Sequence, residues 1–391
     1  MSAHARIRLR PALAAVALCS VLAACSSGAS GSPRTADSPA AEEPAAKVTV
    51  VSPAAGRTVT VTATGGTLTA VKVVDAKGGV LAGRIAPGGA SWVSERVAAP
   101  GVSYRVEATA RTAGGKATTS RSTFDTAEAE KVNKLTLAPG KNTTVGVGQP
   151  LSIVFDGPVT RKADVERQLR VTTSNGTEGS WGWLKDWSGK DRADWRPKEY
   201  WRPGTKVTLE ATLNGVDSGG GWFVRDYKTG FTVGERQIVK VDLDAKKLRL
   251  ERAGRVVRTI PVSGGTPGGD KRSWRGTAVL MSKEGTINMN SETVGLGDAY
   301  DKMVDYSMRL TWSGMYAHAA PWNAQWFGVA NRSSGCIGMS TAQAASFYGE
   351  VRVGDPFEIK GGDTKGTVAE GNGYGAWNVS WPQWKAKSAL S

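Results

Sequence analysis

Cysteine and histidine are scarce in this chain of 391 residues, which has three cysteines and two histidines. They are Cys19, Cys25, Cys336, His4 and His318. So few thiols argue against a disulfide scaffold, and so few imidazoles argue against a zinc site, which would need several carboxylates in their place. The sequence therefore indicates neither a metal nor a nucleotide cofactor.

Long apolar runs are missing as well, except for a short one near the start. Three arginines precede "PALAAVALCSVLAA", which has 14 residues and is too short to span a bilayer. The run ends in "LAAC" (22–25), which resembles a bacterial lipobox, whose cysteine is lipidated and becomes the new N-terminus. We expect a lipoprotein signal peptide at 1–24 with lipid on Cys25. The alternative is an ordinary signal peptide that is cut nearby.

With this leader removed, Cys336 is the one free thiol and His318 is the one imidazole, 18 positions earlier. A lone cysteine is more often a small hydrophobe in a core, and a lone histidine often has no role. Because these two groups stand so close together, we interpret them as a nucleophile and its base. We expect the imidazolium, and to a smaller extent the helix start that follows, to lower the pKa of the thiol.

Acidic residues are outnumbered, so that the formal net charge is +15. A basic surface is compatible with nucleic acid, but export argues against that partner and favours anionic envelope polymers and lipid headgroups. No long Lys/Arg block occurs, which indicates an ordinary solvated surface. Residues 25–46 are rich in Ser, Gly, Ala and Pro and predict a flexible tether.

Short alternating segments rich in Val and Thr begin near residue 47 and predict a mainly β protein. "PGVSYRVEAT" (100–109) matches "PGTKVTLEAT" (203–212) without a gap, at an offset of 103 residues. A repeat of this length predicts two immunoglobulin-like β-sandwich domains, at 47–128 and 129–235.

Tryptophans cluster in the second of these domains. Stacking of glycans is one use for such side chains, but packing in a core or an interface is more common, and we favour packing. They are Trp181, Trp183, Trp187, Trp195 and Trp201.

A third domain is expected at 236–362. Its first part reads as three strands joined by turns at "DAKK" (244–247) and "RAGR" (252–255), and "GDPFEIK" (354–360) reads as a closing strand. "STAQAASFYGE" has a capping-box pattern, so a short helix should follow Cys336. The tail, 363–391, carries three tryptophans and is expected to fold back on the neighbouring domains.

The residues around Cys336 suit acyl transfer. The amides of Gly335 and Cys336 are candidates for binding an oxyanion. His318 has no acidic neighbour in "GMYAHAAPW", so we expect the Ala319 carbonyl to orient its ring. Histidine before cysteine at this spacing fits neither papain-like peptidases nor sortases.

The stretch "YAHAAPWNAQWFGVANRSSGCIGMS" (316–340) resembles the signature of the L,D-transpeptidase catalytic domain (YkuD type), and the domain plan resembles its actinobacterial members. The resemblance implies Cys336 as nucleophile and His318 as proton acceptor and donor. It also implies a flap, "INMNSETVGLGDAY" (287–300). The residues that it places beside the substrate are Ser333, Ser334, Gly335, Met289, Tyr300 and Trp322.

Three positions depart from the family pattern. Ser334 replaces a histidine, Gly338 replaces an asparagine or arginine, and "KRSWRGT" (271–277) blurs a Thr-Pro-x-Gly stretch. The cysteine–histidine pair requires none of them, so we expect them to affect substrate contacts.

The resemblance implies an enzyme that forms 3→3 cross-links between peptidoglycan stem peptides through a thioester, with release of D-alanine. It also implies attachment to the outer face of the membrane, within the wall, and acylation by carbapenems. Two alternatives stay open: an L,D-carboxypeptidase, in which water replaces the acceptor amine, and an inert wall-binding lipoprotein.

Overall fold

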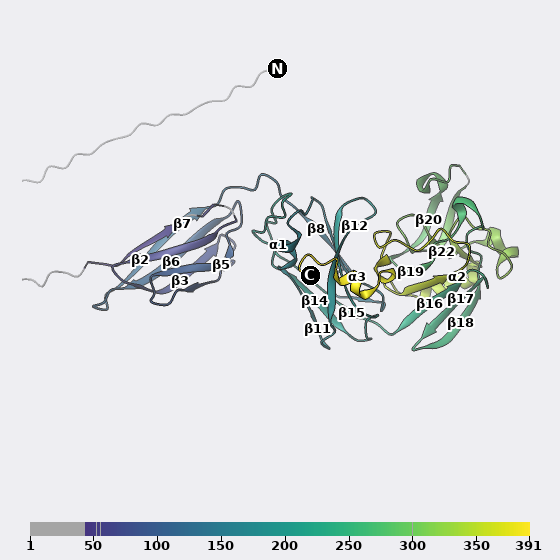
Figure 1. The fold of residues 1–391 in the computed structure, drawn as a ribbon, viewed down its shortest axis with the longest axis horizontal. Coiled ribbons are helices and arrows are strands. Elements are labelled where there is room, and N and C mark those ends of the chain that lie inside the picture. Colours follow the sequence, from purple (N-terminus) through teal and green to yellow (C-terminus); the bar gives the residue numbers. More distant parts are fainter. Residues whose placement is uncertain (1–43, 52, 55, 299) are drawn as a thin grey trace, which may run out of the picture. The chain divides into compact units, whose positions relative to one another are not determined.

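The computed structural model describes residues 44–391, apart from residues 52, 55 and 299 (Figure 1). The predicted signal peptide, Cys25 and nearly all of the tether lie outside the described residues. In the part that is described, no helix is long and apolar enough to cross a membrane.

The described strands form six sheets, and each sheet takes its strands from one of three stretches of the chain (Figure 1). The predicted mainly β fold is confirmed. The first stretch contains β1 (Lys47–Val51), β2 (Thr58–Thr64), β3 (Thr67–Asp75), β4 (Gly83–Ile85), β5 (Ser91–Val97), β6 (Ser103–Arg111) and β7 (Ala117–Asp125). Its two sheets have the orders β1-β2-β5-β4 and β3-β6-β7.

The second stretch also builds two sheets, with the orders β12-β13-β10-β8 and β11-β14-β15-β9. Its elements are β8 (Leu135–Ala138), β9 (Thr143–Val145), β10 (Leu151–Phe155), α1 (Lys162–Glu166), β11 (Leu169–Thr173), β12 (Gly179–Lys185), β13 (Asp191–Pro197), β14 (Lys206–Ala211) and β15 (Tyr227–Val233). The exact limits of two sandwich domains stay a prediction.

The sequence repeat has a structural counterpart. Its first copy contributes β6, which pairs with β3 and β7, and its second contributes β14, which pairs with β11 and β15. Both strands therefore have an antiparallel partner on each side, and alternate side chains of each are buried in the core beneath the sheet.

Four of the five clustered tryptophans are buried in the core of the second stretch, as expected. Trp183 stacks on Phe155 with ring centroids 5.4 Å apart, and Trp195 stacks on Trp201 at 5.3 Å. Trp187 is exposed instead, because it lies in the turn between β12 and β13.

The third stretch contains the sheets β18-β17-β16-β24-β19 and β20-β21-β22-β23. Its strands are β16 (Gln237–Asp242), β17 (Lys247–Arg252), β18 (Arg255–Pro261), β19 (Gly276–Val279), β20 (Ser282–Asn290), β21 (Asp301–Arg309), β22 (Tyr316–Ala319), β23 (Ile337–Met339) and β24 (Pro356–Lys360). Its helices are η1 (Gly269–Lys271), η2 (Ser291–Val294), η3 (Pro321–Trp326) and α2 (Thr341–Glu350).

The three strands predicted at the start of this stretch are confirmed as β16, β17 and β18, and the predicted closing strand is β24, parallel to β16. The expected helix after Cys336 is α2. The Ser340 hydroxyl accepts a hydrogen bond from the Gln343 amide at 3.3 Å, which caps its first turn.

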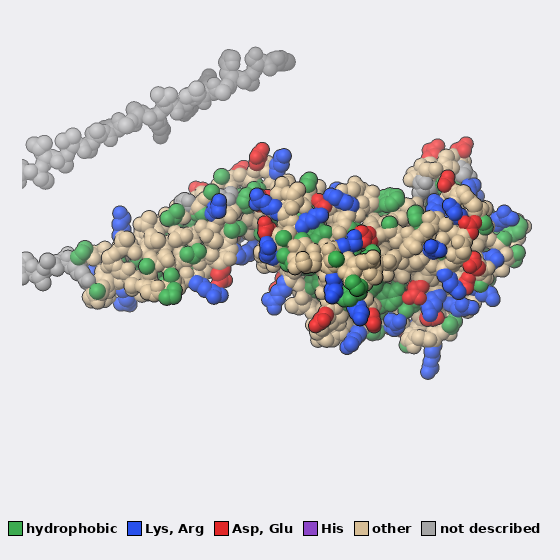
Figure 2. All heavy atoms as spheres, viewed as in Figure 1, with side chains coloured by type: hydrophobic (Ala, Val, Ile, Leu, Met, Phe, Trp, Pro, Cys, Tyr) green, Lys and Arg blue, Asp and Glu red, His purple; other side chains and the backbone are tan. Residues whose placement is uncertain are grey.

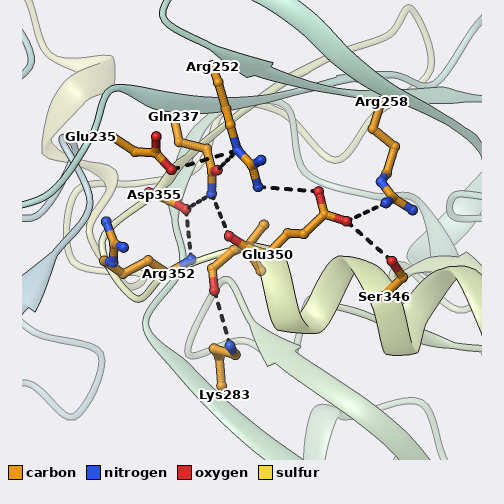
Figure 3. A network of polar contacts seen from close by, with 10 residues as sticks. Glu235, Gln237, Arg252, Arg258, Lys283, Ser346, Glu350, Arg352 and Asp355 are labelled. Atoms are coloured by element: carbon orange, nitrogen blue, oxygen red, sulfur yellow. Dashed lines mark hydrogen bonds and ion pairs between the residues drawn. The ribbon is translucent and has the colours of Figure 1, made fainter.

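A polar network holds the far end of α2 against the large sheet (Figure 3). Glu350, the last residue of the helix, accepts hydrogen bonds from Arg258 at 2.5 Å and from Arg252 at 3.3 Å. Gln237 on β16 donates to the Glu350 carbonyl at 3.0 Å and to buried Asp355 at 2.6 Å. Since α2 follows β23, and Cys336 immediately precedes that strand, these contacts anchor the far end of the helix that comes after the thiol.

The tail contains η4 (Gly375–Asn378) and α3 (Trp381–Lys385) and packs against the second stretch, as predicted. The Trp384 side chain is fully buried, and its indole donates to the Ser180 carbonyl at 3.0 Å. The Trp377 indole donates to the Gly148 carbonyl at 2.7 Å.

The buried side chain of Arg196 contacts all three tryptophans of the tail. The Arg196 guanidinium carbon lies 4.8 Å from the ring centre of Trp377, 5.5 Å from that of Trp381 and 5.0 Å from that of Trp384. Its Nη2 donates to the Val379 carbonyl at 2.8 Å. These contacts combine cation–π attraction with a hydrogen bond in a site shielded from water.

Lys and Arg side chains are scattered over the visible face among Asp and Glu (Figure 2). No block of one sign stands out in this view, in agreement with the expectation of an ordinary solvated surface.

Candidate active site

Cys336 and His318 are brought together by two buried neighbouring strands. β22 and β23 run parallel, with Ala317 opposite Ile337 and His318 opposite Gly338. Every residue of both strands is buried. Cys336 comes immediately before β23, so the pairing of two distant segments places the thiol beside the strand that carries the imidazole.

Both side chains line one cavity of about 190 Å³. Its wall includes the flap residues and the loop residues that the sequence pointed to. The lining residues are Met289, Tyr300, Lys302, Val304, His318, Ala320, Trp322, Asn323, Arg332, Ser333, Ser334 and Cys336.

Hydrogen bonds hold the loop before Cys336 in place. Gly335 has a φ of +120°, which a side chain disfavours. Its carbonyl accepts a hydrogen bond from the Ser273 hydroxyl at 2.7 Å, and that hydroxyl in turn accepts from the Gly265 amide at 2.9 Å. The Ser333 hydroxyl donates to the Cys336 carbonyl at 2.5 Å. These contacts fix the backbone on both sides of the thiol.

The oxyanion site stays a prediction. The Gly335 amide donates to the Ser333 hydroxyl at 3.2 Å, so it already has a partner. The Ser333 hydroxyl therefore braces the loop, because the tight turn brings it back onto the backbone of its neighbours. The Cys336 amide stays the candidate donor to an oxyanion.

His318 is oriented by the carbonyl that we expected. Its Nδ1 lies 2.6 Å from the Ala319 carbonyl oxygen, which can only accept, so Nδ1 carries the proton and Nε2 is the free acceptor. The ring is buried, and burial lowers its pKa because water no longer solvates the imidazolium. Trp322 lies beside it, with ring centroids 6.0 Å apart.

The charge state of the thiol differs from our expectation. Burial raises the pKa of Cys336 to about 11, although the Tyr316 backbone amide favours the thiolate. The sulfur is within hydrogen-bond distance of the Gly314 carbonyl, at 3.5 Å. Among the described residues Cys336 makes no hydrogen bond or ion pair with His318. Desolvation disfavours both charged forms, so the resting pair is a neutral thiol and a neutral imidazole.

The predicted flap is a hairpin of β20 and β21 with η2 at its tip. Met289 on β20 and Tyr300, which directly precedes β21, both line the cavity. Burial and the nearby Cys336 raise the pKa of the Tyr300 phenol to about 12.

Several wall residues were not anticipated from the sequence. Tyr300 directly precedes β21, and Lys302 and Val304 follow it at every second position, so strand alternation accounts for all three lining the cavity. Arg332 stands four residues before Cys336. Strand alternation could have predicted Lys302 and Val304 as wall residues, whereas no sequence pattern pointed to Ala320 or Asn323.

Comparison with known proteins gives two family matches. The L,D-transpeptidase catalytic domain (YkuD) matches residues 236–359, and the bacterial Ig domain (Big_10) matches residues 49–217. L,D-transpeptidase 2 of Mycobacterium tuberculosis is 34% identical over 339 residues, which are 85% of this chain and 80% of that protein.

L,D-transpeptidase 5 of the same species is 34% identical over 256 residues, which are 65% of this chain and 55% of that protein. Among solved structures, LD transpeptidase LdtMt1 in complex with imipenem has a TM-score of 0.50 and 34% identity. That match covers 59% of this chain and 99% of the other.

Proposed function

This chain belongs to the L,D-transpeptidase family, and from that premise we propose that it forms 3→3 cross-links between peptidoglycan stem peptides, with Cys336 as nucleophile and His318 as base. The observation that carries the proposal is the shared cavity, in which the one described thiol meets the one described imidazole.

The reaction begins from the neutral pair. As Cys336 Sγ attacks the carbonyl between the third residue of the donor stem and its terminal D-alanine, the thiol proton passes to Nε2 of His318. Nδ1 keeps its proton because it donates to the Ala319 carbonyl. The oxyanion accepts from the Cys336 amide, and one such donor contributes about 3 kcal/mol.

Collapse of the tetrahedral intermediate breaks the C–N bond. His318 returns its proton to the nitrogen, D-alanine leaves, and a thioester to Cys336 remains. The side-chain amine of an acceptor stem then attacks the thioester carbonyl and loses a proton to His318, and the thiol is regenerated. No further reactant is needed, because the energy of the broken amide is kept in the thioester.

The test is incubation with purified tetrapeptide muropeptides, read by mass spectrometry. Cross-linked dimers are expected with wild type and should be lost in Cys336→Ala and His318→Gln, while Trp187→Ala, at an exposed site far along the chain, should keep them. Trimmed monomers alone would identify a carboxypeptidase. Muropeptides left unchanged by wild type as well as by Cys336→Ala would identify an inert binder.

Acylation by a carbapenem tests the nucleophile separately. A related enzyme has been solved with imipenem, and we expect imipenem to add one drug mass to this protein at Cys336. Intact-mass measurement of wild type beside Cys336→Ala checks this, and a folded wild-type protein without the adduct would contradict the assignment.

For its location, we propose export and lipid attachment through Cys25, which would hold the enzyme at the outer face of the membrane, within the wall. The leader composition and the "LAAC" stretch support this. Metabolic labelling with a palmitate analogue should mark wild type and not Cys25→Ser. Equal labelling of both, or of neither, would refute attachment at Cys25.

A further inference from the structure

The cavity around Cys336 contains two cations and no carboxylate. Lys302 comes from β21 of the flap, and Arg332 comes from the loop that leads to Cys336. No Asp or Glu lines the same space. The wall of the cavity that contains the nucleophile therefore carries a net positive charge.

Within the described part of the chain, no ion pair joins Lys302 or Arg332 to an acidic side chain, although Arg332 also lines a second cavity whose wall includes Asp244 and Asp363. Each head group instead lies near an indole ring: Lys302 Nζ is 4.7 Å from the centre of Trp322, and the Arg332 guanidinium is 5.2 Å from that of Trp326. Trp322 belongs to the wall of the cavity and Trp326 does not. Neither ring cancels the charge of its cation.

The size of the cavity limits what can bind. About 190 Å³ is below the range of pockets that enclose a drug-sized ligand, so the cavity takes the end of a peptide rather than a whole stem. The group to be expelled in the proposed reaction is a C-terminal amino acid, and its carboxylate is separated from the departing nitrogen by a single carbon atom. An anion therefore stands close to the attacked carbonyl.

We propose that Lys302 and Arg332 bind the terminal carboxylate of the donor stem and make the enzyme selective for donors whose leaving residue ends in a free carboxylate. This inference rests on the proposed function. The two cations act as specificity determinants: they bind the leaving residue and so position the scissile carbonyl over Cys336, in the manner of a charge-assisted hydrogen bond.

The experiment compares three synthetic donor tetrapeptides whose third residue has a side-chain carboxylate. The first has a free carboxylate at its C-terminus, and the second has an amide there. The third keeps the free C-terminal carboxylate but has the side-chain carboxylate of its third residue converted to an amide. Acyl-enzyme formation is followed by intact mass, and kcat/KM is measured for each donor. The variants are Lys302→Gln, Arg332→Gln, their combination, and Arg332→Lys as a conservative replacement.

The matched control is the double variant Lys72→Gln/Arg255→Gln, which removes the same net charge from two exposed positions on β3 and β18. It separates the local effect of the cavity cations from the long-range effect of total charge.

Wild type should prefer the free acid to the terminal amide by at least tenfold, and amidation of the third residue should change little. The double cavity variant should lose the preference by slowing the acid and sparing the amide, while the control keeps it and Arg332→Lys keeps part of it. The preference should fall with added salt, because both side chains are exposed.

Equal rates for acid and amide in wild type, or a preference that survives in the double cavity variant, would overturn the inference alone. A rate loss that follows amidation of the third residue would also overturn it. If wild type forms an acyl-enzyme with none of the three donors, the proposed function itself is wrong.

Discussion

Cys336 is predicted to keep its proton across the neutral range of pH. With the pKa raised to about 11, against an ordinary 9.0, roughly one thiol in 10⁴ is ionised at pH 7 instead of roughly one in 10². The difference corresponds to about 3 kcal/mol against the thiolate. Desolvation of the sulfur is the cause, because the closed strand pair leaves it 7% exposed.

The assay is the ultraviolet absorbance of the thiolate, taken as the difference between wild type and Cys336→Ala from acid to alkaline pH. The signal should be absent at pH 7 and should rise only toward pH 11. His318→Gln should leave this curve in place, since the resting imidazole makes no ion pair with the sulfur.

A thiolate signal that is already complete at pH 6 and disappears in His318→Gln would refute the reasoning. That result is the signature of a thiolate–imidazolium pair, in which the thiol pKa lies far below its ordinary value. The electrostatics of the site would then be set by the histidine and not by burial.

Three other predictions address the frame of the site. Burial raises the pKa of Asp355 to about 6, so the folded state binds its proton more tightly than the unfolded chain; the contribution of Asp355 to stability is greatest below about pH 4 and falls by up to about 3 kcal/mol as the pH rises through 6. Thermal melts of Asp355→Asn should lack this fall, and a profile identical to that of wild type would contradict it. Arg196→Ala should lower the free energy of unfolding by about 3 kcal/mol in denaturant and expose the tail to proteolysis. Arg202→Ala, at an exposed position, should do neither. A tail that stays intact in Arg196→Ala would argue against a stabilising role for the contacts between Arg196 and the tail tryptophans. Gly335→Ala forces a side chain to φ +120°, at about 1–3 kcal/mol of strain, and should slow imipenem acylation by roughly 5- to 150-fold with unchanged circular dichroism. A normal acylation rate would show that the loop relaxes freely.

Features that depend on neighbouring residues in sequence were predictable. The strands β16, β17 and β18 follow from alternation and from turns, and the start of α2 follows from a serine cap, since both patterns are local. The pairing of Cys336 with His318 was also predictable, because cysteine and histidine are so scarce that the described chain has a single thiol and a single imidazole.

The charge state of that pair was not predictable from the sequence. Spacing says that an imidazole is near a thiol, but the pKa of each depends on how much water reaches it. Here β22 and β23 are buried along their whole length, and this burial outweighs the helix start after Cys336. The cations were missed for a related reason: Lys302 and Arg332 lie 30 residues apart in sequence, and only the folded structure brings them to the wall of one cavity.

A neutral resting pair would also suit a lone thiol outside the cell, which is the location that we propose for this chain. Oxidants react with the thiolate, so a thiol with a pKa of about 11 presents roughly 100-fold less reactive sulfur at pH 7 than one at 9.0. The same burial leaves Nε2 of His318 unprotonated and ready to accept a proton when a carbonyl arrives. Nucleophilicity is then produced by proton transfer during attack and is not stored in the resting enzyme. In the location proposed for this chain, that arrangement protects Cys336 between turnovers without reducing its use within one.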